Sequence, residues 1–264
     1  MIANLIVSFS GFVGFITIFL ILLRYKSNRI TNVYLIAIFF IVALRMLIIG
    51  VFTSENHYYL TTLLTKYNNL LIVIVPCMYL YFDNLIKDYK KFQVHNSIHF
   101  IIPLLFNIID YSYDNKYFKA NNISYYYYTF FALYSIIYFT LTIKLLNTKV
   151  WNREGEIGVV IKQNQLLKNW SIYLSSILAI IAARLIITLF LEIKNHSYYF
   201  GTSYLWISAV FWLILYFKII ISPEILYGYT FLNSKINEQK KNDNPIISFW
   251  TNTPISAISN SQDI

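Results

Sequence analysis

The chain has 264 residues, of which 58% are hydrophobic, 19% are aromatic and only 12% are charged. A water-soluble domain carries roughly twice that charged fraction, so the composition excludes an ordinary soluble fold. The single cysteine, Cys77, excludes an internal disulfide and any site built from several cysteines. The net charge of +9 raises the question of a nucleic-acid partner, which the positions of the charges must decide.

Seven apolar runs follow one another along the chain. A bilayer core needs about twenty mostly apolar residues per helix, so each run is interpreted as a membrane-spanning helix. The runs are Ile2–Leu23, Thr31–Phe52, Tyr67–Ile86, Ser97–Asp110, Tyr125–Leu146, Trp170–Ile193 and Tyr204–Ile221. The fourth run is short and holds Pro103 and Asn107, so a kinked or partly interfacial helix is the alternative there. The sequence thus predicts an all-α, polytopic membrane protein with seven transmembrane helices.

Positive charges are concentrated in alternate loops. Most lysines and arginines follow the first, third and fifth runs or lie in the tail, whereas the opposite loops hold only Lys66, Lys116, Lys119 and Lys194. Because basic loops favour the cytoplasm, we expect the N-terminus outside and the C-terminus in the cytoplasm. The net charge is then a topology signal, since no loop interleaves a dense basic run with stacking aromatic residues.

Two arginines, Arg45 and Arg184, lie within the second and sixth runs. A charge inside the bilayer costs on the order of several kcal/mol unless it reaches the interface or finds a partner. Both positions are near the middle of their predicted spans, so we expect both side chains to face the bundle interior. Candidate partners are Glu192, two turns after Arg184, and Asp110 and Glu55 near the outer surface. A ligand site, a switchable ion pair and a fixed polar clamp all stay open as explanations.

The third and fourth runs hold further candidates. His95 and His99 are four residues apart, a spacing that places both on one face of an α-helix. A zinc site needs further ligands, and none converges in the sequence, so a hydrogen-bonded His99 is the simpler explanation and no metal or cofactor is expected. Pro76 lies midway along the third run and should kink it, as a hinge or as a fixed shape. Cys77 beside it is expected to be a packing residue.

Motifs of catalytic sites are not visible in the sequence. It contains no HExxH, no GxSxG and no phosphate-binding glycine loop, so we expect no enzymatic activity. A retinal-type pump would need a lysine deep in the last span, whereas Lys218 lies at its end. Transporters commonly show internal repeats and helices broken by glycine or proline, and this chain has only 7 glycines and no visible repeat.

Two stretches of the sequence resemble a known family. The stretch PCMYLYFDNLIKDYKKFQVHNSIHFIIPLLF, from Pro76 to Phe106, is similar to the P-x-x-x-Y-L-Y…H-F-x-x-P-x-L pattern of membrane-embedded AraC-type transcription regulators, although only two residues separate Pro76 from Tyr79. SPEILYGY, from Ser222, resembles the N-P-x-I-L-Y-G sequence that ends their last transmembrane helix. With seven runs in the same order, the resemblance covers essentially the whole chain. It implies a multi-pass protein of a bacterial inner membrane.

The resemblance also implies a domain organisation. Residues 1–228 would form the transmembrane sensor module, and residues 229–264 would begin a cytoplasmic linker. In the family a DNA-binding domain with two helix-turn-helix units follows, and the tail offers neither the helices nor the basic phosphate contacts of one unit. We expect a chain truncated before that domain, with a stand-alone sensor and a separate DNA-binding partner as the alternative. The residues that would couple the last helix to the output are Pro223, Glu224, Tyr227 and Gly228.

The predicted function is therefore the sensor portion of a membrane-tethered regulator. Its ligand-binding or switch candidates are Arg45, Pro76, His99, Arg184 and Glu192. Expected partners are the lipid bilayer, a small or lipid-soluble ligand and, where signalling uses dimerisation, a second copy of the chain; direct DNA binding by this chain is not expected. The alternative is a small transporter or receptor-like membrane protein that holds an anionic ligand at the buried arginines.

Overall fold

The computed structural model describes residues 2–23, 29–52, 70–87, 91–113, 123–152, 158–195, 204–223 and 226. Within these ranges the chain is all-helical. The α-helices are α1 (Ile2–Leu23), α2 (Arg29–Phe52), α4 (Leu71–Lys87), α5 (Ile101–Tyr113), α6 (Ile123–Leu146), α7 (Gly158–Asn195) and α9 (Leu205–Ile221). A 3₁₀-helix, η2 (Val94–Phe100), precedes α5, and a π-helical turn, η3 (Asn147–Trp151), follows α6.

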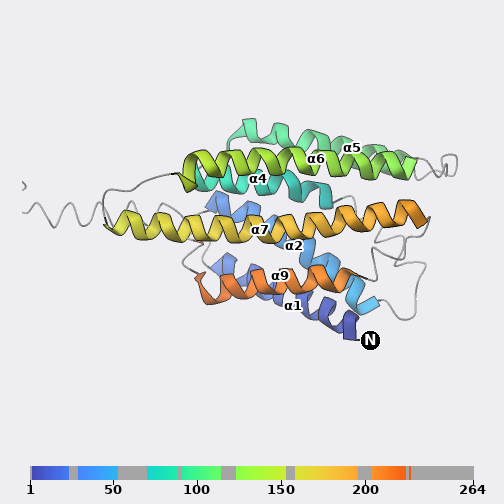
Figure 1. The fold of residues 1–264 in the computed structure, drawn as a ribbon, viewed down its shortest axis with the longest axis horizontal. Coiled ribbons are helices and arrows are strands. Elements are labelled where there is room, and N and C mark those ends of the chain that lie inside the picture. Colours follow the sequence, from blue (N-terminus) through green and yellow to red (C-terminus); the bar gives the residue numbers. More distant parts are fainter. Residues whose placement is uncertain are drawn as a thin grey trace, which may run out of the picture.

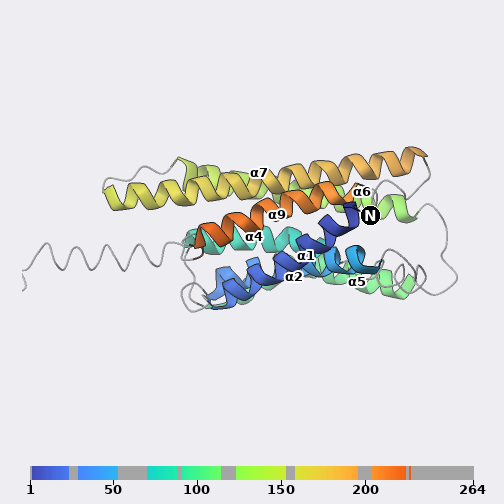
Figure 2. The same cartoon turned by 90° about the horizontal axis from the view of Figure 1, so that it is seen from below.

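The helices lie side by side along the long axis of the molecule, and successive helices run in opposite directions (Figures 1 and 2). One end of the bundle holds the N-terminus of α1 and the beginnings of α4, α6 and α9, and is called the first end. The opposite end, where these four helices finish, is called the lysine end, because it carries Lys87, Lys144, Lys149, Lys168 and Lys218.

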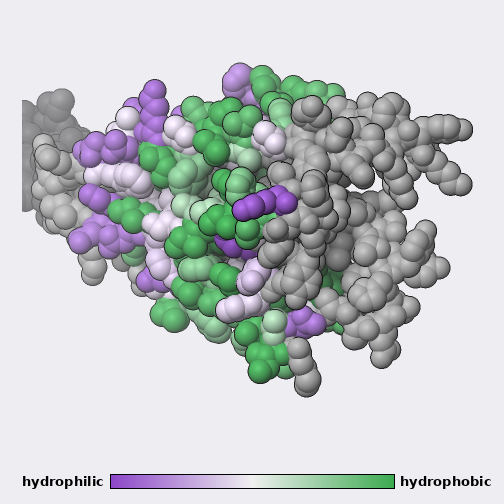
Figure 3. Space-filling view, turned by 45° about the vertical axis from the view of Figure 1, so that its right-hand side comes forward, coloured by the Kyte–Doolittle hydropathy of each residue, from purple (hydrophilic) through white to green (hydrophobic). Residues whose placement is uncertain are grey.

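Five of the described helices are long and apolar enough to cross a membrane: Ile2–Leu23, Ile30–Val51, Leu70–Lys87, Thr129–Trp151 and Gln165–Thr188. Only 17% of the Thr129–Trp151 segment is buried inside the protein, and its outward residues include Leu133, Ile136 and Ile137. Figure 3 shows hydrophobic residues over the middle of one face, with polar side chains gathered toward the lysine end. Such a surface is unfavourable in water and suits lipid, so the described helices are those of a multi-pass membrane protein.

Each predicted run coincides with a helical element, and the fourth and seventh are the short ones. The fourth begins as the 3₁₀-helix η2 and continues as α5. Pro103 lies in the first turn of α5, where a missing N–H removes no helical hydrogen bond. The seventh, α9, has 17 residues, a length of about 26 Å, slightly less than the ~30 Å thickness of a bilayer core.

The sixth predicted run differs most from the structure. It was expected to begin at Trp170, whereas α7 begins at Gly158 and has 38 residues. The helix projects past the rest of the bundle at the lysine end (Figure 1). Half of the added residues are polar, with Lys162, Gln163 and Gln165 among them, and an apolar-length criterion overlooks these three although they are good helix formers.

Small residues bring α1 and α2 into close contact. A Cβ atom at Gly11 of α1 would lie 2.7 Å from the backbone nitrogen of Leu47 and 2.9 Å from the backbone oxygen of Ala43. A Cβ atom at Gly50 of α2 would collide with Ser8. Membrane helices associate through such contacts, because lipid leaves no hydrophobic driving force between them and packing must supply the attraction.

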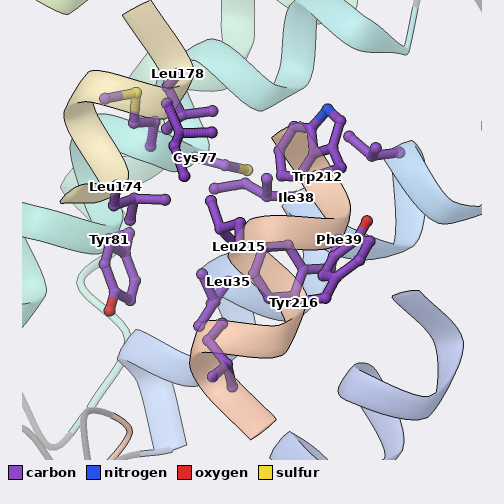
Figure 4. Close-up of a cluster of buried hydrophobic side chains, with 14 of the residues drawn as sticks. Leu35, Ile38, Phe39, Cys77, Tyr81, Leu174, Leu178, Trp212, Leu215 and Tyr216 are labelled. Carbon is purple, nitrogen blue, oxygen red and sulfur yellow. The ribbon is translucent and has the colours of Figure 1, made fainter. Parts of the chain in front are cut away.

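Helix α9 is fixed against α1 and α2. The Ser10 hydroxyl of α1 donates a hydrogen bond of 3.2 Å to the backbone oxygen of Ala209. The Phe39 ring of α2 contacts Tyr216 and Trp212 of α9 edge to face, with centroids 5.1 and 6.1 Å apart. Figure 4 shows these rings in the core, where side chains of α2, α4, α7 and α9 meet.

The part of α7 near the lysine end is held by buried hydrogen bonds. Trp170 Nε1 of α7 donates to the Tyr81 hydroxyl of α4 over 2.8 Å, and both side chains are buried. Trp151 Nε1 of η3 donates to Ser171 Oγ over 2.9 Å, and Lys168 Nζ donates to the Trp151 carbonyl over 3.1 Å. These bonds join α4, η3 and α7 near the lysine end.

Replacing Gly11 with valine should destabilise the bundle by about 1–3 kcal/mol, because the new side chain meets backbone atoms of α2 that cannot rotate away. Ala183→Val, a similar enlargement at an exposed position of α7, is the control and should cost about 0.5 kcal/mol or less. Reversible unfolding in mixed micelles measures both. Equal stability of the two variants would contradict the close approach of α1 and α2.

Candidate functional site

A cavity of about 160 Å³ lies between α2, α4, α6, α7 and α9. Its described lining is mostly aliphatic and aromatic. The lining residues are Val42, Arg45, Met46, Leu71, Ile74, Val75, Met78, Phe131, Ala132, Ser135, Tyr138, Phe139, Leu178, Ile181, Ala182, Arg184, Leu185, Ile186, Leu205, Ser208 and Trp212. The structure therefore offers a mainly apolar chamber inside the membrane-spanning part of the chain.

Arg45 and Arg184 are the only charged side chains among the described residues that line the cavity. Arg45 comes from α2 and Arg184 from α7, helices that are far apart in the sequence. Both side chains are partly buried. The structure thus places two of the predicted site residues on the wall of one cavity.

Both arginines lie past the middle of their apolar segments. Arg45 lies in the last third of the apolar segment Ile30–Val51, and Arg184 lies in the last third of Gln165–Thr188. Both segments run toward the first end of the bundle (Figure 1), so both charges are displaced toward that end.

The cavity extends from the first end into the bundle. Leu71 and Leu205, the first residues of α4 and α9, line it at the first end. Met78 and Trp212 are about two helical turns further along these helices and therefore lie deeper. The arginines consequently border a chamber that continues past them between apolar side chains.

His99 is connected to the cavity through one hydrogen bond. Its Nδ1 atom lies 2.8 Å from the hydroxyl of Tyr138, which lines the cavity from α6. The His99 ring also contacts Tyr79 of α4, with ring centroids 5.3 Å apart, and its backbone oxygen accepts a 3.4 Å hydrogen bond from Tyr134. His99 therefore joins η2 to α4 and α6, as a hydrogen-bonded residue next to the cavity wall.

His95 does not share the environment of His99. It is exposed, whereas His99 is partly buried. The expectation that both lie on one helical face is wrong, because η2 is a 3₁₀-helix and positions three apart, not four, are aligned in it. Among the residues that the structure describes, no three His, Cys, Asp or Glu side chains come together as metal ligands would.

Pro76 is buried in α4, and the helix continues through it. A proline here cannot donate a backbone hydrogen bond to the carbonyl of Ile72, one turn earlier. Three nearby residues, Ile74, Val75 and Met78, line the cavity. The weakened turn of α4 is therefore part of the cavity wall.

The remaining predicted residues are only partly described. The side chains of Glu192, Asp110 and Glu55 lie outside the described part of the chain, as do Glu224, Tyr227 and Gly228. Pro223 is the second residue after the end of α9, and Leu226 beyond it is buried in the core.

Helix α4 also holds two neighbouring buried polar residues, Asp83 and Asn84, that none of the sequence predictions included. The carboxylate of Asp83 forms an ion pair with Lys87 one turn later, with Oδ1 and Nζ 2.8 Å apart, and Asp83 is 5% exposed. Asn84 beside it is fully buried and donates to the backbone oxygen of Leu80. Two signals were available in the sequence: Asp83 is the one acidic residue of its run, and a spacing of four residues suits an ion pair on a helix.

Tyr138→Phe should lower the free energy of unfolding by about 1 kcal/mol, because it removes the hydrogen bond to His99. The control is Tyr173→Phe, whose hydroxyl makes only a 3.4 Å bond to the Ile214 carbonyl at an exposed position and should cost less than about 0.5 kcal/mol. Unfolding of both variants in mixed micelles provides the comparison. If the two variants lose the same stability, the bond between Tyr138 and His99 does not form.

No protein-family model, curated protein or solved structure matches the chain. The arrangement of Arg45, Arg184 and Tyr138 around the cavity is therefore the starting point for a functional conclusion.

Proposed function

We propose that the chain is the membrane-integral sensor portion of a membrane-tethered AraC-type transcription regulator. It would span a bacterial inner membrane seven times, with α5 and α9 as its two shorter spans, its N-terminus outside and its C-terminus in the cytoplasm. Residues 1–228 form the sensor module and residues 229–264 the linker. The observation that carries the proposal is a cavity bordered both by two arginines and by α9, the helix that leads to the linker.

The contacts of the family-like stretch support this proposal. Tyr79 and His99 both belong to that stretch, and their rings are in contact. Tyr81 of the same stretch accepts the buried hydrogen bond of Trp170. The positions on which the resemblance depends thus hold α4, η2 and α7 together around the cavity, which gives a physical reason for those residue types.

The path from cavity to output runs along α9. Leu205, Ser208 and Trp212 line the cavity, and Pro223 lies just beyond the end of the same helix. A ligand that prefers one position of α9 would shift the population of two bundle arrangements and move the start of the linker. The output is a DNA-binding domain of the AraC type, carried by the same polypeptide or by a separate one.

The distribution of the described lysines supports the orientation. Those near the ends of α4, α6 and α9 lie at the lysine end, and Lys194 near the end of α7 lies at the first end. Positively charged residues favour the cytoplasmic side of a membrane. The lysine end is accordingly assigned to the cytoplasm, together with the end of α9.

A chimera tests the proposal. A DNA-binding domain that needs dimerisation is fused after Ile264, and reporter transcription is measured for the parent and for Arg45→Leu and Arg184→Leu. We expect both substitutions to abolish the signalling response, because each removes a charge from the cavity that senses the ligand. Lys149→Leu, which removes an exposed charge at the lysine end, is the matched control and should keep the response.

Membrane insertion of each variant is checked on immunoblots. Parental output from both arginine variants, with normal insertion, would exclude a switch role for these residues. A fusion of alkaline phosphatase after Ile264 reports the topology, because this enzyme is active only on the outer side; high activity would overturn the assigned orientation and the regulator with it.

A second candidate function is a small transporter or receptor-like protein for an anionic ligand. The two arginines at an apolar cavity favour it as well. Uptake of a labelled anion by proteoliposomes, together with a chimera whose reporter transcription does not respond, would favour this alternative.

A further inference from the structure

We propose that the cavity binds a single-chain fatty acid, whose carboxylate is held by Arg45 and Arg184 and whose alkyl chain extends toward Met78, Leu178 and Trp212. This inference names the ligand class of the sensor, and its consequence for signalling rests on the proposed function. The binding itself depends only on the cavity.

The charge of the site selects an acid. Two guanidinium groups border one mainly apolar chamber, and no carboxylate belongs to its described lining. Each guanidinium has five N–H donors in a planar fork that matches a carboxylate, so it can bind a ligand and protein groups at the same time. In a site with few polar groups, both cations attract an ionised ligand head.

The shape of the site selects a chain behind the acid group. The arginines are displaced toward the first end, and the chamber continues past them to Met78 of α4, Leu178 of α7 and Trp212 of α9. An amphiphile that enters from the membrane surface at the first end would meet the cations with its head and the apolar wall with its tail. The order of polar and apolar groups in the cavity matches the order in a fatty acid.

The volume of the site selects a single chain. A cavity of about 150 Å³ lined by apolar side chains takes up one benzene ring, so a chamber of about 160 Å³ has space for a short alkyl segment. Two acyl chains and a glycerophosphate head exceed that space several-fold. A medium-chain monocarboxylate can place its head and the first part of its chain in this space, because the cavity is partly open, whereas most of a phospholipid would lie outside it.

A fatty acid bound in the cavity would contact two of the helices that form its wall, α6 and α9. The chain would touch Tyr138, which holds His99, and Trp212, which packs against Phe39 in the core. A fatty acid therefore has contacts with α6 and α9 that a ligand at the protein surface would lack.

Native mass spectrometry of the delipidated chain in detergent tests the inference. Decanoate is the probe, and methyl decanoate, which has the same chain without the charge, is the matched control ligand. We expect one decanoate bound per chain, and methyl decanoate at least about tenfold weaker, since its head cannot pair with the arginines.

Four variants separate the contributions. The double variant Arg45→Gln/Arg184→Gln should weaken decanoate binding at least about tenfold. The double variant Arg45→Lys/Arg184→Lys, which keeps both positive charges, should weaken it less. The pair Lys144→Gln and Lys149→Gln removes two charges at the lysine end and should leave binding unchanged. Ala182→Phe keeps both arginines and fills the cavity, so it should abolish binding even if the glutamine pair fails to fold.

Three results would overturn the inference: equal binding of the acid and its methyl ester, full binding by Ala182→Phe, or retention of phosphatidylglycerol in place of decanoate. The outcome is distinct from that of the reporter chimera. Decanoate binding with a chimera that ignores the arginine substitutions would keep the ligand site and reject the regulator. A responsive chimera that binds no decanoate would reject the ligand class alone.

Discussion

Two guanidinium groups, on helices distant in the sequence, share one cavity inside a bundle whose outer surface is apolar. A charge at membrane depth costs on the order of several kcal/mol unless polar groups or water surround it. Arg45 of α2 and Arg184 of α7 border one chamber, and α4, α6 and α9 complete its walls. Two further candidates lie beside that chamber: Pro76 belongs to the helix turn in its wall, and His99 lies one hydrogen bond behind it.

The chamber lies where firmly packed parts of the bundle meet. On one side, glycines bring α1 against α2, and Ser10 and Phe39 fix α9 to both. On the other side, the bond between Trp170 and Tyr81 holds α7 to α4. Packed helices shift between discrete arrangements and do not deform continuously, so a ligand at their junction can move a whole helix. Because α9 lines the chamber and then leads to the linker, it is the natural element for transmission.

Hydrophobic length alone located the helices, because a lipid environment demands it of each span separately. Hydrophobic length did not predict the start of α7 at Gly158, because this part of the helix projects beyond the apolar segment. The spacing of His95 and His99 was misleading for a different reason, since it assumes an α-helix and η2 is a 3₁₀-helix. The meeting of Arg45 with Arg184 depends on how helices pack, which no local pattern contains. Tyr138 carried no signal among 24 tyrosines, whereas the buried Asp83 could have been found as the one acid of its run.

A double-mutant cycle tests most directly whether the two arginines share one chamber. The free energies of unfolding of Arg45→Gln, Arg184→Gln and the double variant are measured in mixed micelles. Residues in one cavity couple by about 0.5–3 kcal/mol, whereas sites further apart than about 7–10 Å are additive within about 0.3–0.5 kcal/mol. The account predicts that the double variant is at least about 0.5 kcal/mol less stable than the sum of the single effects, because each single substitution already removes the repulsion between the two cations and the double variant removes it only once. Strict additivity would contradict it.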